Sequence, residues 1–236
     1  MAEFRFRQFM VDDRGCGMKI CSDSVLLGAW FLPAVRDARS VADAGAGSGV
    51  LSLMAAQECP DADIYAVELD PGAADASEAN FAASPWAERM KVVRGDFLTV
   101  DLPVRPDVIV SNPPYFDNGA VSPDTARAAA RYQASLSYRT LIERAAAILA
   151  PDGQLGMVSP PDCENDIIFA AELAGLRLRR LWRVATTPRR PERRLLWHFG
   201  REACPTEIRR FDMRRPDGAP SDEYIALVDP FYIKIS

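Results

Sequence analysis

The sequence predicts an α/β fold with a mainly parallel sheet of seven strands, helices on both faces and an antiparallel terminal strand. Apolar, strand-like runs alternate with helix-like segments through the middle of the chain, as in βαβ units. A glycine-rich turn after the first of these strands opens the first helix of the series. The last two strand-like runs have no helix between them, which indicates an antiparallel pair.

The expected elements divide the chain into three parts. Residues 1–39 form an N-terminal lead with a helix over 24–32 that is capped by Ser22 or Asp23. Residues 203–236 form a C-terminal extension, packed on the core, with a short helix after Ser221. Residues 40–202 form the core, whose elements follow in chain order: strand 40–44, helix 50–58, strand 64–69, helix 71–82, strand 90–93, strand 108–110, a helix from its cap Ser137 to 149, strand 155–158, helix 162–174, and a hairpin of 178–184 with 195–199.

The composition excludes several classes of protein. The chain has 236 residues, of which 48% are hydrophobic, so one domain with a small appendage is expected. The longest apolar stretch, residues 25–35, is too short to span a bilayer, and the N-terminus has no signal-peptide architecture, so we expect a cytoplasmic protein. The five cysteines form no CxxC pair and His198 is the only histidine, which argues against a disulfide framework and a metal site. We expect a monomer that binds neither a metal nor a membrane.

The charge of the chain is unevenly distributed. The formal net charge is −5, but residues 177–215 carry thirteen arginines against four acidic residues, about +9, so the rest of the chain carries about −14. A basic surface on an acidic protein is typical of a phosphate-binding face. The alternative is that these arginines pair with carboxylates elsewhere in the fold.

The glycine-rich turn indicates a cofactor that carries a positive charge. Gly45, Gly47 and Gly49 have the spacing G-x-G-x-G, whereas a turn that packs a dinucleotide pyrophosphate has G-x-G-x-x-G. Asp43 precedes the first glycine by two residues, where a carboxylate would repel a pyrophosphate and attract a cationic amine. S-adenosylmethionine carries both an ammonium group and a sulfonium, and it is the cofactor that we expect.

Two further acidic residues follow strand-like runs in the same half of the chain. Glu68 ends the second strand about 20 residues after the glycine-rich turn, where an acid can accept hydrogen bonds from both hydroxyls of a ribose. Asp96 follows the third strand and could accept from the adenine amine of the cofactor, while Phe97 could pack on the adenine ring. The alternative for Asp96 is that it caps a turn.

The tetrapeptide Asn112-Pro113-Pro114-Tyr115 ends the apolar run 108–111 and predicts the chemistry. At the carboxyl edge of a parallel sheet it would lie beside the cofactor. The Asn112 side-chain oxygen and the Pro113 carbonyl could accept the two hydrogens of an exocyclic amine, and Tyr115 could stack on a flat ring. Catalysis would then be positioning and electrostatics, without a covalent intermediate. The alternative is a proline-rich turn.

These motifs together resemble the class I amino-methyltransferases, which have a Rossmann-like fold. More narrowly, nearly the whole chain is similar to the bacterial tRNA1(Val) (adenine-37-N6)-methyltransferase family. Beside the motifs above, the resemblance is carried by 4–9, 18–30, Glu68-Leu69-Asp70, 127–131, 135–138 and the tail from 216 to 232. The chain departs from the family at Cys21-Ser22-Asp23-Ser24, where Gly-Thr-Asp-Gly is frequent.

The resemblance implies a substrate and further site residues. It implies methylation of the N6 amine of the adenine beside the anticodon, position 37 of tRNA1(Val), with Ser22 and Asp23 of the lead closing the cofactor site. It also places Lys19 and Leu69 among the cofactor-binding residues. Open alternatives are adenine of ribosomal RNA, glutamine of a protein release factor, a small molecule, and an RNA-binding relative that has lost transfer.

Two segments are expected to contact RNA. The loop 188–194 offers Arg189, Arg190, Arg193 and Arg194 to phosphates of a tRNA. The segment 117–134 is expected to be a mobile lid that orders on RNA, with Arg127 and Arg131 reaching phosphate. An anticodon loop is largely single-stranded, so extruding one base from it costs less than from a duplex.

Overall fold

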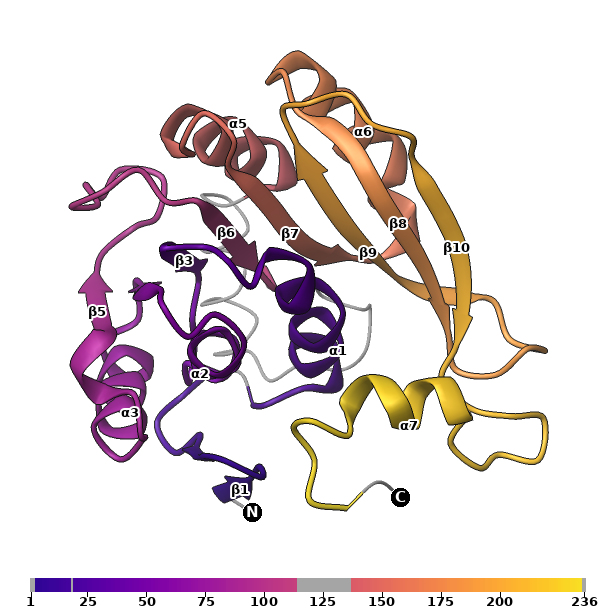
Figure 1. Ribbon diagram of the computed structural model, residues 1–236, viewed down its shortest axis with the longest axis horizontal. Helices are drawn as coiled ribbons and strands as arrows, with labels where there is room; N and C mark the ends of the chain where they lie inside the picture. The colour runs from indigo at the N-terminus through magenta and orange to yellow at the C-terminus, as the bar shows by residue number, and fades with distance from the viewer. Residues whose placement is uncertain (1–2, 18, 114–136, 235–236) are drawn as a thin grey trace.

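The computed structural model describes residues 3–17, 19–113 and 137–234. Within these residues the main sheet has eight strands: β3 (Ser40–Ala44), β4 (Asp63–Glu68), β5 (Met90–Arg94), β6 (Val108–Ser111), β7 (Gln154–Ser159), β8 (Arg177–Ala185), β9 (Glu192–Gly200) and β10 (Glu207–Asp212). Their order across the sheet is β10-β8-β9-β7-β6-β3-β4-β5 (Figure 1). Only β9 among them runs antiparallel, and it lies between β7 and β8.

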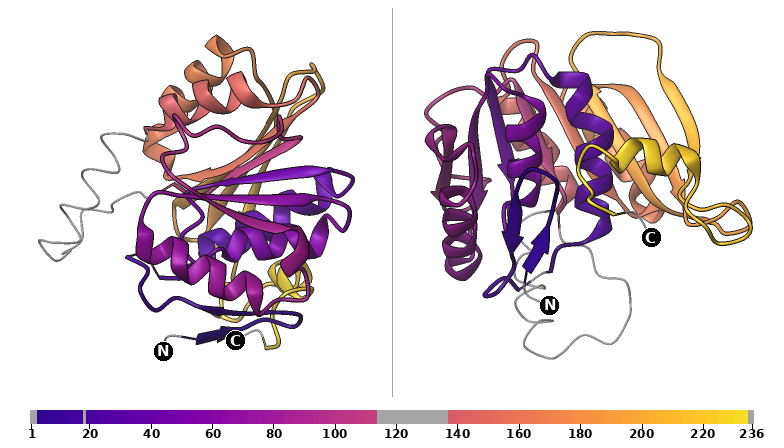
Figure 2. Two further views of the ribbon diagram at one scale, coloured as in Figure 1. Left: turned by 90° about the vertical axis from the view of Figure 1, so that its left-hand side faces the viewer. Right: turned by 60° about the horizontal axis from the view of Figure 1, so that its bottom comes forward.

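Helices cover both faces of this sheet. They are α1 (Ser22–Phe31), α2 (Val50–Glu58), α3 (Pro71–Ala82), α5 (Tyr138–Ile148), α6 (Glu164–Leu173) and α7 (Asp222–Val228), with short 3-10 turns at Leu32–Val35, Ala87–Arg89 and Pro161–Cys163. Figure 2 shows α5 and α6 on one side of the sheet and α1, α2 and α3 on the other. A small antiparallel hairpin of β1 (Glu3–Arg5) and β2 (Met10–Asp12) lies near the C-terminal segment.

The alternation of side chains along the strands builds two hydrophobic cores. In β3 the side chain of Val41 packs on the side of α1 and α2, while those of Ala42 and Ala44 pack on the side of α5 and α6. In β6, Val108 packs on the side of α1 and α2, and Ile109 packs on the side of α5 and α6. Because successive side chains of a strand point to opposite faces, a sheet covered by helices on both sides is apolar at every position. This explains the continuous apolar runs of the sequence.

The expected parallel α/β core is confirmed. Strand 40–44, helix 50–58 and helix 71–82 have the predicted bounds. Ser137 is the expected cap, since its hydroxyl accepts from the main-chain N–H of Thr140 at 3.2 Å, and the short helix expected after Ser221 is capped by Ser221, whose hydroxyl accepts from that of Tyr224 at 3.1 Å.

Four details of the prediction were wrong. The sheet has an eighth strand, β10, which pairs in parallel with β8 from within the C-terminal extension. As an edge strand it buries Phe211 but leaves Ile208 59% exposed, so it lacks the apolar pattern of the inner strands.

The other three corrections concern the lead and the loop 188–194. The hairpin of the lead was not foreseen. Helix α1 begins at Ser22 with Cys21 at the N-cap, so neither Ser22 nor Asp23 caps it. The expected loop 188–194 ends early, because Arg193 and Arg194 belong to β9, and Arg194 pairs with Val184 of β8.

Candidate functional site

The expected site residues meet at one edge of the sheet. Asp43 lies in β3, Glu68 ends β4 and Asn112 follows β6, and β3 is paired in parallel with both β4 and β6. Their carboxyl ends therefore meet at the same edge, where ligands of parallel α/β sheets bind. Asp96 follows β5, the next strand outward.

The glycine-rich turn is held in a conformation that requires glycine. Gly45, Gly47 and Gly49 have φ values of 77°, 59° and 79°, the left-handed region that L side chains rarely adopt. At Gly49 a Cβ would also lie 2.5 Å from a ring carbon of Phe81. At Gly47 nothing lies within 4 Å of the Cβ position, so this main chain is open on its outer side. A ligand can approach the turn there at van der Waals distance.

Asp43 is a buried acid, and only one of its two side-chain oxygens has a hydrogen-bond partner among the described residues. Its side chain is 1% exposed, and Ser52 Oγ donates to Oδ2 at 2.7 Å. The other oxygen, Oδ1, is buried and has no hydrogen-bond partner among the described residues. Burial raises the pKa of Asp43 to about 7, and the neighbouring Glu68 adds to the effect. A cationic ligand beside Oδ1 would supply the missing partner and favour the charged form.

Glu68 fixes the turn as well as facing the site. Its carboxylate accepts from the main-chain N–H of Gly47 at 2.7 Å and from that of Asp70 at 2.8 Å. Burial raises the pKa of Glu68, while these main-chain hydrogen bonds act against the increase. A carboxylate has about four acceptor positions, and main-chain N–H groups use at most three of them, so the side chain can still accept from a hydroxyl group of a ligand.

The residues after β5 have structural partners of their own. Asp96 accepts from the main-chain N–H of Leu98 at 2.9 Å, which is the turn-capping alternative foreseen for it. Phe97 is 3% exposed and packs in the core beside α5, so its ring offers little surface to a cofactor. Leu69 is 46% exposed at the end of β4. The expected cofactor contacts of these three residues stay predictions.

Asn112 has the geometry expected of an amine acceptor. The side chain is 8% exposed, and Nδ2 donates to Ser24 Oγ at 2.8 Å and to Cys21 Sγ at 3.2 Å. Its oxygen, Oδ1, is buried and unpartnered within the described part of the chain. Buried acceptors without a partner are rare and costly in folded proteins, so an incoming donor would be stabilised here. The two partners of Nδ2 come from the lead and had not been recognised from the sequence.

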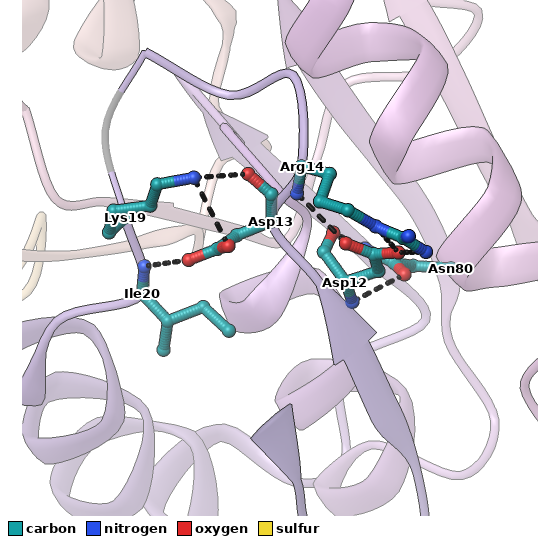
Figure 3. Close-up of polar contacts among 6 residues, drawn as sticks. All are labelled: Asp12, Asp13, Arg14, Lys19, Ile20 and Asn80. Carbon is teal, nitrogen blue, oxygen red and sulfur yellow. Dashed lines mark hydrogen bonds and ion pairs between the residues drawn. The ribbon is translucent and has the colours of Figure 1, made fainter. Parts of the chain in front are cut away.

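The lead approaches the same edge through a loop that Asp13 organises. Lys19 Nζ lies 2.9 Å from the main-chain oxygen and 3.3 Å from Oδ1 of Asp13, and Oδ2 of Asp13 accepts from the main-chain N–H of Ile20 (Figure 3). Asp13 is 5% exposed, whereas the Lys19 side chain is 63% exposed. The Lys19 ammonium therefore closes this loop, and its expected contact with a cofactor stays a prediction.

Asn80 of α3 joins the lead to the glycine-rich turn, a role that the sequence did not reveal. Its Oδ1 accepts from the main-chain N–H of Asp12 at 2.9 Å (Figure 3). Its Nδ2 donates to the main-chain oxygens of Asp12 at 3.0 Å and of Ser48 at 2.9 Å. One turn earlier, Ser77 Oγ donates to the oxygen of Gly47 at 2.7 Å. Helix α3 thus fixes the glycine-rich turn, where the cofactor is expected.

Asp23 forms an ion pair with Arg194. The two side chains lie 2.7 Å apart and are 16% and 18% exposed. Arg194, expected to contact RNA, thus binds the first turn of α1 to β9. Ser22 is exposed beside this pair.

The basic segment is partly neutralised inside the fold. Ion pairs to carboxylates involve Arg183, Arg194, Arg209, Arg210 and Arg215. Arg189 and Arg190 are exposed in the turn between β8 and β9, and within the described ranges neither has an ion pair. The main-chain oxygen of Arg190 accepts from the Arg210 guanidinium at 2.9 Å, which holds this turn. The pairing alternative therefore holds for these five arginines, whereas the expected phosphate contacts of Arg189 and Arg190 stay predictions.

Other expectations concern residues away from this edge. His198 is 4% exposed, and burial together with Arg180 lowers its pKa to about 3, so it is neutral and structural. Within the described ranges, no three His, Cys, Asp or Glu side chains are grouped to hold a metal ion, and no helix has the length and apolarity to cross a membrane. Pro114, Tyr115, Arg127 and Arg131, with the expected lid 117–134, lie outside the described residues.

The chain is similar to known methyltransferases over most of its length. Residues 23–174 match the family model described as methyltransferase small domain. A protein of Tolumonas auensis named tRNA1(Val) (adenine(37)-N6)-methyltransferase is 40% identical over 234 residues, 99% of this chain and 98% of the relative. A protein of the same name from Bacteroides thetaiotaomicron is 38% identical and covers 98% of each chain.

Solved structures of low sequence identity share the fold. A protein of Agrobacterium tumefaciens described as a predicted O-methyltransferase has a TM-score of 0.68 at 20% identity, covering 88% of this chain and 96% of its own. An O-methyltransferase of neocarzinostatin biosynthesis, solved with S-adenosylmethionine, has a TM-score of 0.51 at 17% identity, covering 74% of this chain and 51% of its own. At these identities the likeness shows the fold alone.

Proposed function

We propose that this chain, which belongs to the methyltransferase small domain family and within it to the tRNA1(Val) (adenine(37)-N6)-methyltransferases, methylates the N6 amine of an anticodon-loop adenine. The observation that carries the proposal is the Oδ1 of Asn112 at the carboxyl edge of β6, which is buried and has no partner among the residues that the structure describes. An adenine amine has two hydrogens to donate, and this oxygen needs a donor.

The residues present fit S-adenosylmethionine as the cofactor. Asp43 leaves one buried carboxylate oxygen for a cation, Glu68 keeps an acceptor position for a ribose hydroxyl, and the turn at Gly47 has open space outside it. When bound, this cofactor supplies the methyl group. The conclusion that the chain is an S-adenosylmethionine-dependent enzyme follows from its family and its fold.

Asn112 acts by orienting the amine. The lone pair of adenine N6 is delocalised into the ring, so the nitrogen is a poor nucleophile. Hydrogen bonds from the amine to Asn112 Oδ1 and to the Pro113 carbonyl favour a pyramidal nitrogen and direct its lone pair. The contribution is positioning and electrostatic stabilisation by groups that are already in place. Stacking by Tyr115 and phosphate contacts by Arg127 and Arg131 stay predictions, as does the expectation of a cytoplasmic monomer.

Methyl transfer to tRNA that lacks the modification tests the proposal. The protein is incubated with labelled S-adenosylmethionine and the tRNA nucleosides are identified by mass spectrometry. N6-methyladenosine should form with the wild type, and Asn112→Ala should reduce its rate at least a hundredfold, the scale seen when a positioned hydrogen-bonding group is removed from an active site, roughly 10²–10³. Asn165→Ala, an exposed asparagine of α6, is the matched control.

The outcomes separate the alternatives. Transfer to ribosomal RNA or to a protein glutamine in place of tRNA would contradict the proposed substrate and retain the reaction class. Cofactor binding without transfer to any of the three would contradict a macromolecular substrate and indicate either a small-molecule methyltransferase or a relative that has lost catalysis.

A further inference from the structure

The amide of Asn112 is held from behind by the first turn of α1. Its nitrogen donates to Ser24 Oγ at 2.8 Å and to Cys21 Sγ at 3.2 Å, contacts that span 88 and 91 residues of sequence. Ser24 is 7% exposed, so water does not compete effectively for its hydroxyl. Ser24 Oγ and Cys21 Sγ lie 3.7 Å apart, close enough for a weak contact between them.

The orientation of this amide decides what it can do to an amine. An asparagine side chain has an acceptor oxygen on one side and a donor NH₂ on the other, and rotation by about 180° exchanges them. With Oδ1 toward the site, the amide accepts from the substrate amine. With Nδ2 toward the site, donor would face donor, and the amine would lose its partner. A group that binds the amide nitrogen therefore favours the orientation in which the asparagine accepts from an amine.

Ser24 is the stronger of the two groups that bind it. A hydroxyl oxygen is a good acceptor, whereas thiol sulfur is a weak one. The helix that carries Ser24 is rigidly placed, since α1 is buried from Ser24 to Phe31 and Asp23 in the same turn pairs with Arg194 of β9. The serine hydroxyl therefore approaches Asn112 from a fixed direction.

We propose that Ser24 is a positioning residue for methyl transfer, whose hydroxyl binds Asn112 Nδ2 and so keeps Asn112 Oδ1 directed at the substrate amine. The proposal rests on the proposed function, because it takes an amine as the substrate. The proposal is specific to this chain, because members of the tRNA1(Val) (adenine(37)-N6)-methyltransferase family frequently have glycine at the position of Ser24.

The substitution Ser24→Ala removes the hydroxyl and little else. Alanine is the best helix former, so the first turn of α1 is not weakened by its propensity. We expect kcat to fall about tenfold, the effect of one well-formed hydrogen bond, while the affinities for S-adenosylmethionine and tRNA stay within about twofold. Ser40→Ala is the matched control: Ser40 is 8% exposed and also accepts an N–H hydrogen bond, but it begins β3 at the opposite edge of the sheet. The control should retain wild-type kcat.

A double-mutant cycle separates positioning from general structural damage. If Ser24 acts through Asn112, Ser24→Ala should cause no further loss when it is added to Asn112→Ala. A further tenfold loss in that background would overturn the proposal, as would an unchanged kcat in the single variant.

Nuclear magnetic resonance gives a readout that does not depend on activity. The chain has four asparagines, so selective ¹⁵N-asparagine labelling gives four side-chain amide pairs, and Asn112→Ala assigns the relevant one. The Asn112 amide resonances should shift in Ser24→Ala and stay in place in Ser40→Ala. Unshifted resonances in Ser24→Ala would overturn the proposal. Because no substrate is present, this result stands even if the proposed tRNA substrate proves wrong.

Discussion

The substitution Asp43→Asn should change how the stability of the ligand-free protein depends on pH. Burial raises the pKa of Asp43 from 3.8 to about 7 in the folded chain. The folded protein thus holds this proton up to about pH 7, while the unfolded chain releases it near pH 4. The free energy of unfolding therefore falls as pH rises between these values, and the full cost of ionising Asp43 is present only above about pH 7.

The size of the effect follows from the displacement of the pKa. One pKa unit corresponds to about 1.4 kcal/mol, so the shift of about three units costs the folded protein about 4 kcal/mol above pH 7. Asparagine cannot ionise and escapes this cost. Its amide places an NH₂ group in the buried environment of Oδ1, which costs about 1–3 kcal/mol. That second cost does not depend on pH, so it cancels when two pH values are compared.

Urea unfolding of wild type and Asp43→Asn at about pH 5 and about pH 8 measures the difference directly. The stability of Asp43→Asn relative to wild type should be greater at pH 8 than at pH 5 by about 3 kcal/mol, since about two pKa units of the shift lie in this range. Asp101→Asn, which changes an exposed aspartate after β5, is the control and should give the same difference at both pH values. If Asp43→Asn also gives equal differences, its carboxyl ionises normally and the reasoning from burial is refuted.

Two further predictions concern the turn and the basic surface. Asn80→Ala removes three hydrogen bonds between α3, the lead and the glycine-rich turn, so we expect a loss of about 2–3 kcal/mol in urea unfolding together with weaker S-adenosylmethionine binding, and no loss in Asn165→Ala. Replacing Arg189 and Arg190 by alanine should weaken tRNA binding and flatten the slope of log affinity against log salt by roughly 0.7–0.9 per lost phosphate contact. The pair Arg36→Ala and Arg39→Ala, exposed at the opposite edge of the sheet, changes the net charge equally and should leave the slope unchanged; equal slopes in all three proteins would contradict the assignment.

The sequence predicted the parts of the fold that depend on local patterns. The core strands are apolar at every position because both faces of the sheet are covered, and Gly45, Gly47 and Gly49 are required by positive φ. Asn112 was predictable because it ends an apolar run, and the end of a parallel strand is where ligands bind.

The remaining features depend on contacts between distant residues. Strand β10 was missed because Phe211 alone among its six residues is buried. An edge strand that contains arginines shows no clear alternation of apolar and polar residues. The ion pair of Arg194 could not be foreseen, because its partner Asp23 lies 171 residues earlier in the sequence. Asn80 and Ser24 have unremarkable sequence surroundings, and their roles follow from where α3 and α1 pack. No local pattern marks such residues.

The structure divides control of the site between two parts of the chain. The proposed cofactor side is fixed by α3, through Ser77 and Asn80, and by Glu68, all of which bind the main chain of the glycine-rich turn. Asn112, the proposed amine acceptor, is held by the first turn of α1 and its N-cap Cys21. The two sides are joined in the lead, because β2 is bonded to Asn80 and continues through the Asp13 loop into α1. Loss of Asn80 should therefore weaken cofactor binding first, whereas loss of Ser24 should lower kcat with cofactor affinity retained. A variant of either residue that produced the other's effect would show that the lead transmits displacements across the whole site.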